Sequence, residues 1–260
     1  MRFTKMQGLG NDYLYFYGEV ENPAEVSIKL SDRHFGVGSD GIITISHSDV
    51  ADFKMRIFNA DGSEAKMCGN GIRCVGKYVY DKKHTDKTDL KIETLSGIRT
   101  LKLNVKDGKV ESAAVDMGQV KVSEPADIAV STGTVRCIPV SVGNPHAVVF
   151  VDDAENAPLT TTGRELEHDA FFPEGVNAEF VQIIDKNTIR MRVWERGSGI
   201  TMACGTGACA SVAASVASGF CSKNEDVTVK LDGGDLKIRV LDDYTVIMTG
   251  PAEIVCECEV

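Results

Sequence analysis

Two short glycine-rich motifs that contain cysteine are the residues of this sequence best suited to catalysis. They read MCGNGIRC around Cys68 and ACGTGACA around Cys204, and the two cysteines are 136 positions apart. Each motif lies at a stretch whose apolar spacing predicts a helix, residues 71–81 and residues 207–218. The first turn of a helix has backbone N–H groups without internal partners and carries about half a positive charge. These donors bind anions, and they lower the pKa of a neighbouring thiol from about 8.5 toward neutrality.

Two such motifs brought face to face would hold one anion between two helix ends, with a sulfur atom on each side. This arrangement suits stereochemical inversion at a carbon atom that bears a carboxylate. One thiolate removes the α-proton, the opposite thiol delivers a proton to the other face, and the helix-end donors stabilise the developing negative charge. The two thiols carry one proton between them, so they titrate as a pair. Taken alone, either motif could instead be a glycine-rich turn around a buried cysteine.

The two motifs belong to an internal repeat. LGNDYLYF at residues 9–16 resembles VGNPHAVVF at residues 142–150, and GVGSDGI at residues 36–42 resembles GVNAEFV at residues 175–181. Three weak matches in the same order and at nearly constant offset indicate a duplication. We therefore predict two homologous halves, residues 1–118 with Cys68 and residues 119–249 with Cys204. The alternation at the C-terminus predicts a half-buried strand within residues 250–260, which could pair back onto the first half or onto the second.

The elements that must position these motifs are mostly strands. Alternating apolar and polar residues predict strands at residues 91–94, 100–105, 147–151, 227–231, 236–241 and 245–249. Glycine-containing turns separate several of them, for instance at residues 107–108 and 233–234. Since long helical stretches are few, we predict an α+β fold of two pseudo-symmetric halves. Each half is expected to be a mostly antiparallel sheet with a helix that starts at its Cys-Gly motif.

The overall composition excludes several classes of protein. The chain has 260 residues, of which 43% are hydrophobic and 25% charged, and these values exclude a disordered or membrane-dominated chain. The net charge of −10 argues against a nucleic-acid partner, because such binding depends on Lys and Arg. A charge-free stretch at residues 197–222 is long enough to span a bilayer, but its small side chains favour an enclosed interior helix. No secretory signal is visible, so we expect a cytoplasmic protein.

The eight cysteines do not indicate disulfides or a metal site. Their close pairs are separated by five, four and one residues, and none of these spacings is that of a zinc site. A chain of this length can bury a core without disulfides. We therefore expect no metal site among them, and we expect inert buried thiols at Cys137, Cys221, Cys256 and Cys258.

The motifs resemble the diaminopimelate epimerase family over nearly the whole chain. The segments that carry this resemblance are GLGNDY (8–13), RHFGVGSDG (33–41), FNADGSEAKMCGNGIRC (58–74), VGNPHAV (142–148), EGVNAEF (174–180) and VWERGSGITMACGTGACA (193–210). The resemblance implies a homodimer whose subunit has two barrel-like domains, each around a central helix, with the site in the cleft between them. It also implies interconversion of LL- and meso-2,6-diaminopimelate in lysine and cell-wall precursor biosynthesis, an isomerase reaction without pyridoxal phosphate or metal.

The same resemblance implies roles for individual residues. Cys68 and Cys204 resemble the acid/base pair, with His146 near Cys68 and Glu195 near Cys204 as the groups that tune them. Contacts to the reacting carboxylate are implied for Gly69, Asn70, Gly205 and Thr206, and other substrate contacts for Asn11, Asn59, Asn144, Asn177, Glu195 and Arg196. Such a set suits a second amino-acid centre, since Arg196 can bind a carboxylate through two hydrogen bonds and Glu195 can accept from an ammonium. One position departs from the family pattern, because Gly41 stands where some relatives have Gln.

Two other functions stay open at this point. A proline or hydroxyproline racemase-like enzyme would also use two cysteines, but its substrate lacks the distal zwitterion that Glu195 and Arg196 would suit. A non-enzymatic thiol protein, either a redox sensor or a zinc-binding module, would need closer cysteine partners than these spacings supply. Thiol titration with and without diaminopimelate, together with a zinc assay, distinguishes these alternatives.

Overall fold

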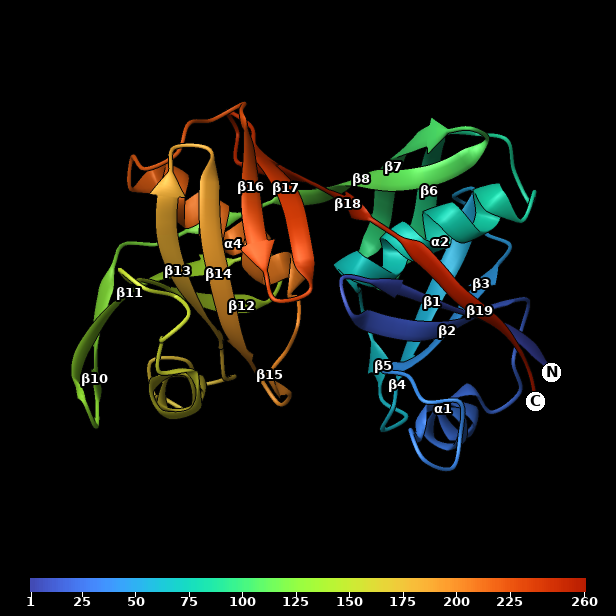
Figure 1. The fold of residues 1–260 in the computed structure, drawn as a ribbon, viewed down its shortest axis with the longest axis horizontal. Helices are drawn as coiled ribbons and strands as arrows, with labels where there is room; N and C mark the ends of the chain where they lie inside the picture. The colour runs from blue at the N-terminus through green and yellow to red at the C-terminus, as the bar shows by residue number, and fades with distance from the viewer. The chain divides into compact units, whose positions relative to one another are not determined.

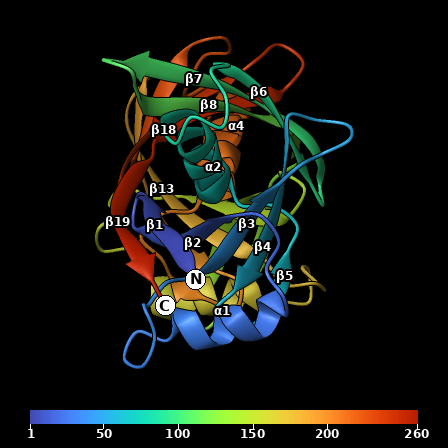
Figure 2. The ribbon, with the colours of Figure 1, turned by 90° about the vertical axis from the view of Figure 1, so that its right-hand side faces the viewer.

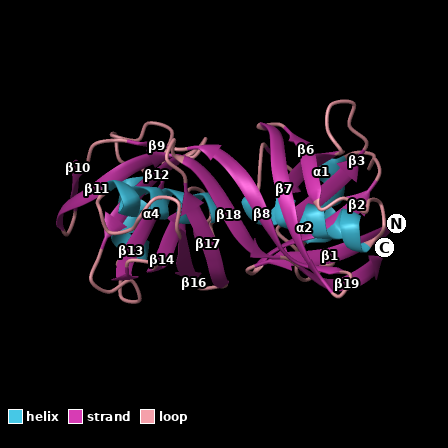
Figure 3. Ribbon diagram, turned by 90° about the horizontal axis from the view of Figure 1, so that it is seen from above, coloured by secondary structure: helices cyan, strands magenta, loops and turns pink.

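The computed structural model describes residues 1–260, which form two compact units. Unit 1 consists of Met1–Asp116 and Thr249–Val260, and unit 2 consists of Met117–Met248. The chain crosses from one unit to the other twice, within β8 (Lys109–Gln119) and within β18 (Thr245–Pro251). Each unit contains one long helix among strands, α2 (Gly69–Asp81) or α4 (Gly205–Ala217), as Figure 3 shows by colour. The predicted α+β class is therefore confirmed.

In unit 1 a series of paired strands lies around α2 (Figure 2). Its other elements are β1 (Arg2–Gly8), β2 (Asn11–Tyr17), α1 (Pro23–Ser31), β3 (Gly41–Ser46), β4 (Phe53–Asn59), β5 (Glu64–Ala65), β6 (Asp89–Thr94), β7 (Gly97–Lys106) and β19 (Glu253–Glu259). β1 pairs antiparallel with β2, β2 parallel with β3, β3 antiparallel with β4, β4 parallel with β6, and β6 antiparallel with β7. The C-terminal strand β19 pairs antiparallel with β1, and β5 pairs with the end of β4.

Unit 2 repeats this succession of pairings around α4 (Figure 1). Its other elements are β9 (Lys121–Val122), β10 (Ala126–Val130), β11 (Gly133–Ser141), β12 (Pro145–Phe150), η1 (Leu159–Gly163), α3 (Arg164–Glu167), β13 (Asn177–Asp185), β14 (Thr188–Glu195), β15 (Gly199–Ile200), β16 (Asp226–Leu231) and β17 (Gly234–Val240). β11 pairs antiparallel with β12, β12 parallel with β13, β13 antiparallel with β14, β14 parallel with β16, and β16 antiparallel with β17. The repeat that the sequence motifs indicated is thus visible in the strand order.

Both central helices are almost fully enclosed, for different reasons of sequence. In α4 small side chains allow the surrounding strands to approach, and Ala208, Ala210 and Ala213 have no exposed surface. In α2 a glycine serves the same purpose, because a Cβ on Gly76 would lie 2.8 Å from a methyl group of Leu103 on β7. The charge-free stretch at residues 197–222 therefore contains an interior helix of 13 residues. No helix of the structure is long and apolar enough to cross a membrane.

The positions of the elements were predicted well from the sequence, whereas the burial of one strand was predicted wrongly. All six predicted strands occur, as β6, β7, β12, β16, β17 and β18, although β12 and β17 end one residue earlier than expected. Both predicted helices occur, and each starts two residues earlier than expected. Cys137 and Cys221 are buried as predicted. The predicted C-terminal strand occurs as β19 and pairs back onto the first half through β1. Its predicted half-burial is wrong, since nearly all of β19 is exposed, including Cys256, and Cys258 is only partly buried. β19 pairs with β1, and neither face of β19 is covered over most of its length, so the alternation of residue types does not lead to burial.

Candidate active site

Each catalytic candidate cysteine caps the helix that follows it. Cys68 precedes α2 in an extended conformation, and its Sγ accepts a hydrogen bond from the N–H of Gly71 at 3.3 Å. Cys204 precedes α4 in the same conformation, and its Sγ accepts from the N–H of Gly207 at 3.3 Å. The sulfur thus takes the place that a Ser, Thr or Asp oxygen occupies at an ordinary helix start. Both thiols lie beside the positive ends of their helix dipoles.

Gly71 and Gly207 occupy equivalent positions of the two helices, and neighbouring side chains leave no room for a Cβ at either position. A Cβ on Gly71 would lie 2.7 Å from Cδ1 of Ile43, whereas a Cβ on Gly207 would lie 2.7 Å from Oε1 of Glu179. Ile43 is on β3 and Glu179 is on β13, the corresponding strands of the two units. The duplicated sites therefore differ in one respect, because the first has an apolar side chain under the helix start and the second has a carboxyl group.

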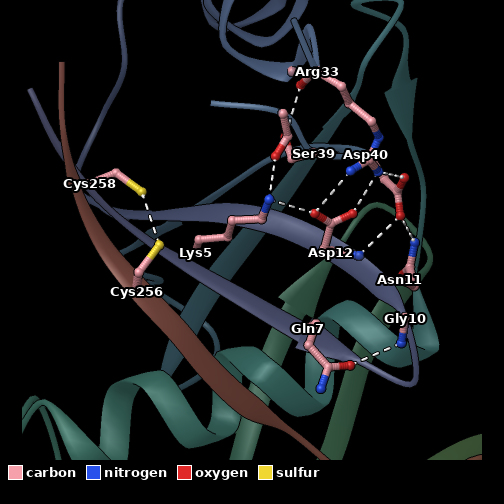
Figure 4. Close-up of polar contacts among 12 residues, drawn as sticks. Lys5, Gln7, Gly10, Asn11, Asp12, Arg33, Ser39, Asp40, Cys256 and Cys258 are labelled. Atoms are coloured by element: carbon pink, nitrogen blue, oxygen red, sulfur yellow. Dashed lines mark hydrogen bonds and ion pairs between the residues drawn. The ribbon is translucent and has the colours of Figure 1, made fainter. Parts of the chain in front are cut away.

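In unit 1 an ordered polar network determines the surroundings of Cys68. The thiol donates to Oδ1 of Asn11 at 3.3 Å, and Nδ2 of Asn11 donates to Oδ2 of Asp40 at 2.7 Å. The same Asp40 oxygen accepts from the N–H of Asp12 at 3.0 Å. Figure 4 shows Asp40 between Asn11 and Arg33, whose guanidinium donates to Oδ1 of Asp40 at 3.0 Å. The amide of Asn11 is thereby oriented with its oxygen toward Cys68.

Two cations balance the two carboxylates of this network. Asp12 is 7% exposed. Its Oδ1 lies 2.8 Å from Nη2 of Arg33, and its Oδ2 lies 3.0 Å from Nζ of Lys5 (Figure 4). The carboxylates of Asp12 and Asp40 raise the pKa of Arg33 above its usual range. These contacts connect β1, β2 and the loop before β3. The RHFGVGSDG motif therefore supplies support for Asn11 that the sequence analysis did not assign.

In unit 2 the surroundings of Cys204 are more enclosed and more acidic. Cys204 is 5% exposed, whereas Cys68 is only partly buried. Burial, together with the carboxylates of Glu195 and Glu179, raises the pKa of Cys204 well above the usual value for a thiol. Hydrogen bonds from Thr206 and Gly207 act in the opposite direction and are outweighed. The expectation that the helix start lowers the pKa is therefore wrong for Cys204, because desolvation and two negative neighbours dominate.

A buried pair of His146 and Glu179 supports this region. His146 Nδ1 lies 2.7 Å from Oε1 of Glu179, and both side chains are fully buried. His146 Nε2 lies 3.1 Å from Oδ1 of Asn144, and Nδ2 of Asn144 donates to Oγ1 of Thr206 at 3.3 Å. Burial raises the pKa of Glu179, and His146 opposes that shift. His146 belongs to unit 2 and Cys68 to unit 1, so their proximity stays a prediction.

The segment after β14 carries the charged substrate candidates of unit 2. Oε1 of Glu195 accepts from the hydroxyl of Thr201. The N–H of Arg196 donates to Oδ1 of Asn177 at 2.9 Å, and its exposed side chain donates to the carbonyl of Glu174 at 2.6 Å. This segment is also held by Glu167, which the sequence analysis missed. Its carboxylate accepts from the indole N–H of Trp194 at 2.6 Å and from the N–H of Gly197 at 2.7 Å.

The remaining predicted residues divide between the units. Asn59, at the end of β4, donates to Oγ of Ser63 at 3.0 Å, and the buried Asn70 accepts from Arg73 at 3.0 Å. Unit 1 thus contains Cys68, Gly69, Asn70, Asn11 and Asn59, and unit 2 contains Cys204, Gly205, Thr206, Asn144, His146, Asn177, Glu195 and Arg196. No cluster of three or more His, Cys, Asp or Glu side chains has the geometry to hold a metal ion.

The backbone at Gly41 leaves no room for a side chain. Its φ is +152°, and a Cβ there would lie 2.1 Å from the carbonyl oxygen of Phe58 on β4. Glycine is therefore required at this end of β3.

Comparison with known proteins gives consistent matches over the chain. The family model described as diaminopimelate epimerase matches residues 3–123 and 138–255. Diaminopimelate epimerase from Acetivibrio thermocellus is 52% identical and covers 100% of this chain and 98% of its own, and that from Bacillus subtilis is 48% identical, covering 98% and 97%. Two solved structures share the fold at low identity. A hydroxyproline epimerase from Agrobacterium vitis has a TM-score of 0.74 at 16% identity, covering 100% of this chain and 90% of its own. A PhzF-family phenazine biosynthesis protein from Bacillus anthracis has a TM-score of 0.79 at 17% identity, covering 100% and 98%.

Proposed function

The chain belongs to the diaminopimelate epimerase family, and we propose that Cys68 and Cys204 act as the acid/base pair of the family's reaction. The protein is an isomerase that epimerises LL-2,6-diaminopimelate to the meso isomer in lysine biosynthesis. The observation that carries the residue assignment is the matched capping geometry. In each unit a cysteine sulfur accepts from a helix N–H at 3.3 Å, so two similar thiol sites are available for the two faces of one carbon.

In the proposed mechanism a thiolate takes the α-proton and the opposite thiol returns a proton to the other face. The carbon changes configuration, and the two cysteines exchange protonation states. Cys204 is buried beside two carboxylates, which favour its protonated form, so we assign it as the acid. We assign Cys68 as the base, a role for which it must first lose the proton that it donates to Asn11. The reverse reaction uses the opposite roles, as microscopic reversibility requires.

The helix starts are proposed to bind the carboxylate at the reacting centre. Gly69 and Asn70 begin α2, and Gly205 and Thr206 begin α4, so their N–H groups are unused by the helices. Such donors stabilise the negative charge that develops when the α-proton leaves, and several together lower the barrier by about 5–10 kcal/mol. The side chain of Asn70 is engaged with Arg73, so we assign only its backbone to this role.

The second amino-acid centre of the substrate is proposed to contact charged and amide groups. Arg196 suits the distal carboxylate, Glu195 suits the ammonium, and Asn11, Asn59, Asn144 and Asn177 complete the set. Buried polar groups matched to a substrate strongly disfavour analogues that lack its polar groups. We propose that His146 acts on the site through Asn144, and that Glu179 is a positioning residue for His146.

We further propose that the two units act as domains on either side of the substrate, that the active form is a homodimer, and that the enzyme works in the cytoplasm. The family resemblance supports these assignments. The reaction chemistry needs no electron sink beyond the donors described above, so no cofactor is assigned.

A chiral assay of the purified protein with LL-diaminopimelate and no added cofactor tests the function, and the same assay in D2O tests the mechanism. We expect meso product with solvent deuterium at the inverted carbon. Cys68→Ala and Cys204→Ala should each lower turnover by at least about 1,000-fold, whereas Cys256→Ala, at an exposed position, should not. Near-normal turnover of either site variant, or inverted product that keeps its original hydrogen, would overturn the two-cysteine mechanism.

A further inference from the structure

Two cysteines outside the site lie side by side on the surface of unit 1. Cys256 and Cys258 are alternate residues of β19, so they point to the same face of the strand. Their Sγ atoms are 3.7 Å apart, as the dashed line in Figure 4 shows. Cys256 is exposed and Cys258 is partly buried. No step of the epimerase reaction uses either thiol.

The strand geometry permits these sulfur atoms to form a bond. Alternate Cα atoms of a strand are about 6.7 Å apart, and disulfides occur at Cα separations of about 4.4–6.8 Å. A bulge lies next to the pair, because Lys5 pairs with Cys256 while Met6 pairs with Ile254, which leaves Val255 without a partner residue. The sulfur atoms reach bonding distance only if the side chains rotate and the backbone of β19 also shortens between the two cysteines, so the bond forms at some cost in strain. Strained and exposed disulfides are the ones that are readily reduced again.

We propose that Cys256 and Cys258 form a thiol–disulfide exchange site whose oxidant is a small-molecule disulfide. The thiolate of Cys256 attacks one sulfur of the oxidant, which forms a mixed disulfide and releases one small thiol. The thiolate of Cys258 then attacks the sulfur of Cys256, which closes the protein disulfide and releases the second small thiol. Two protein thiols are oxidised, one small disulfide is reduced to two thiols, and the two protons leave with those thiols.

The environments of the two thiols determine their order of reaction. Cys256 is exposed and open to the oxidant, whereas Cys258 packs against the cluster that contains Phe3 and Leu14. Burial and the neighbouring Cys256 raise the pKa of Cys258, and the ammonium of Lys5 opposes that shift. Cys258 is thus placed as the resolving thiol, which acts within the protein once the mixed disulfide has formed.

Oxidised glutathione, added to the reduced full-length protein, is the probe that tests this site. We expect the intact mass to fall by two hydrogen atoms, and we expect the C-terminal peptide that contains both Cys256 and Cys258 to carry this loss. Dithiothreitol should reverse the change fully. The Cys258→Ser variant should stop at the mixed disulfide and retain one glutathionyl group on Cys256. The Cys256→Ser variant should react at this strand at least about tenfold more slowly, because the remaining thiol is less exposed.

Three results would overturn the proposal. A stable glutathionyl group on Cys256 of the unsubstituted protein would show that Cys258 does not resolve it. A covalent dimer on a non-reducing gel would show that the bond forms between chains. Reaction at Cys68, the other partly exposed thiol, with no change at Cys256, would show that exposure on β19 does not select the site.

Discussion

Nδ2 of Asn11 lies 2.7 Å from Oδ2 of Asp40, and this contact decides which end of the Asn11 amide faces Cys68. With its NH2 group bound by a carboxylate, Asn11 can present only its oxygen to the thiol, at 3.3 Å. Asp40 is in turn neutralised by Arg33. Asp40 therefore positions the thiol of Cys68 indirectly, because it fixes the orientation of the Asn11 amide.

Replacement of Asp40 should impair turnover more than substrate binding. Asp40→Asn keeps the size but offers the Asn11 amide no charged acceptor, so the amide can turn its NH2 group toward Cys68. We expect kcat to fall about tenfold with a smaller change in KM. Steady-state kinetics across the pH range measures both. Asp49→Asn, at a side chain that is 97% exposed, is the matched control, and equal kinetics for the two variants would contradict the role of Asp40.

Glu179 should hold the pKa of Cys204 high. Its carboxyl Oε1 and the sulfur of Cys204 both lie within 3.1 Å of the point where a Cβ of Gly207 would stand. Glu179→Gln removes a negative charge and keeps a group that can still hydrogen-bond His146. We therefore expect the pKa of Cys204 to fall, with reduced turnover.

The pH dependence of Cys204 alkylation, followed by peptide mass spectrometry, measures this shift. Glu225→Gln changes the same charge at an exposed position of unit 2 and should leave the profile in place. A profile that stays fixed or moves to higher pH in Glu179→Gln would show that desolvation alone sets the pKa of Cys204.

Any side chain at Gly41 should destabilise unit 1. A Cβ at this position would lie 2.1 Å from the carbonyl oxygen of Phe58, which is backbone and cannot turn away. Gly41→Ala should lower the free energy of unfolding by about 2–4 kcal/mol, since backbone strain and a clash act together. Gly133→Ala is the control, because Gly133 has φ +130° with open space around its Cβ position. Denaturant unfolding measures both variants, and equal losses would mean that the clash contributes nothing.

What the sequence could predict depended on how local each feature is. The capping of α2 and α4 by Cys68 and Cys204 depends on a few consecutive residues, so the motifs were sufficient. Glu179 was missed because its contact with His146 depends on the parallel pairing of β12 with β13. The only local signal was a carboxyl group within an apolar strand, NAEFVQII.

Burial was the property that the sequence described least well. The raised pKa of Cys204 depends on its burial and, besides Glu195, on the carboxylate of Glu179 from β13, which no spacing in the sequence reveals. The exposure of Cys256 depends on whether anything covers β19, which alternation of residue types cannot tell. Both errors concern the surroundings of a residue and leave its element correct.

The buried Cys74 thiol should make the protein less stable in alkali. Burial raises the pKa of Cys74 to about 11 from its ordinary value of 9.0. Below pH 9 the thiol is protonated in the folded and the unfolded chain alike. Between pH 9 and 11 the unfolded chain loses this proton while the folded chain keeps it, so the free energy of unfolding falls as the pH rises.

Cys74→Ala removes this contribution, and the loss of stability between pH 8 and pH 10 should become smaller by about 1 kcal/mol. Urea unfolding at the two pH values, in the presence of a reductant, measures the difference. Ser222→Ala changes an exposed group that does not ionise in this pH range and should keep the dependence of the unsubstituted protein. Because each variant is compared with itself at two pH values, the cavity left by the missing sulfur cancels. An identical pH dependence in Cys74→Ala would show that this thiol ionises equally in the folded and unfolded chains.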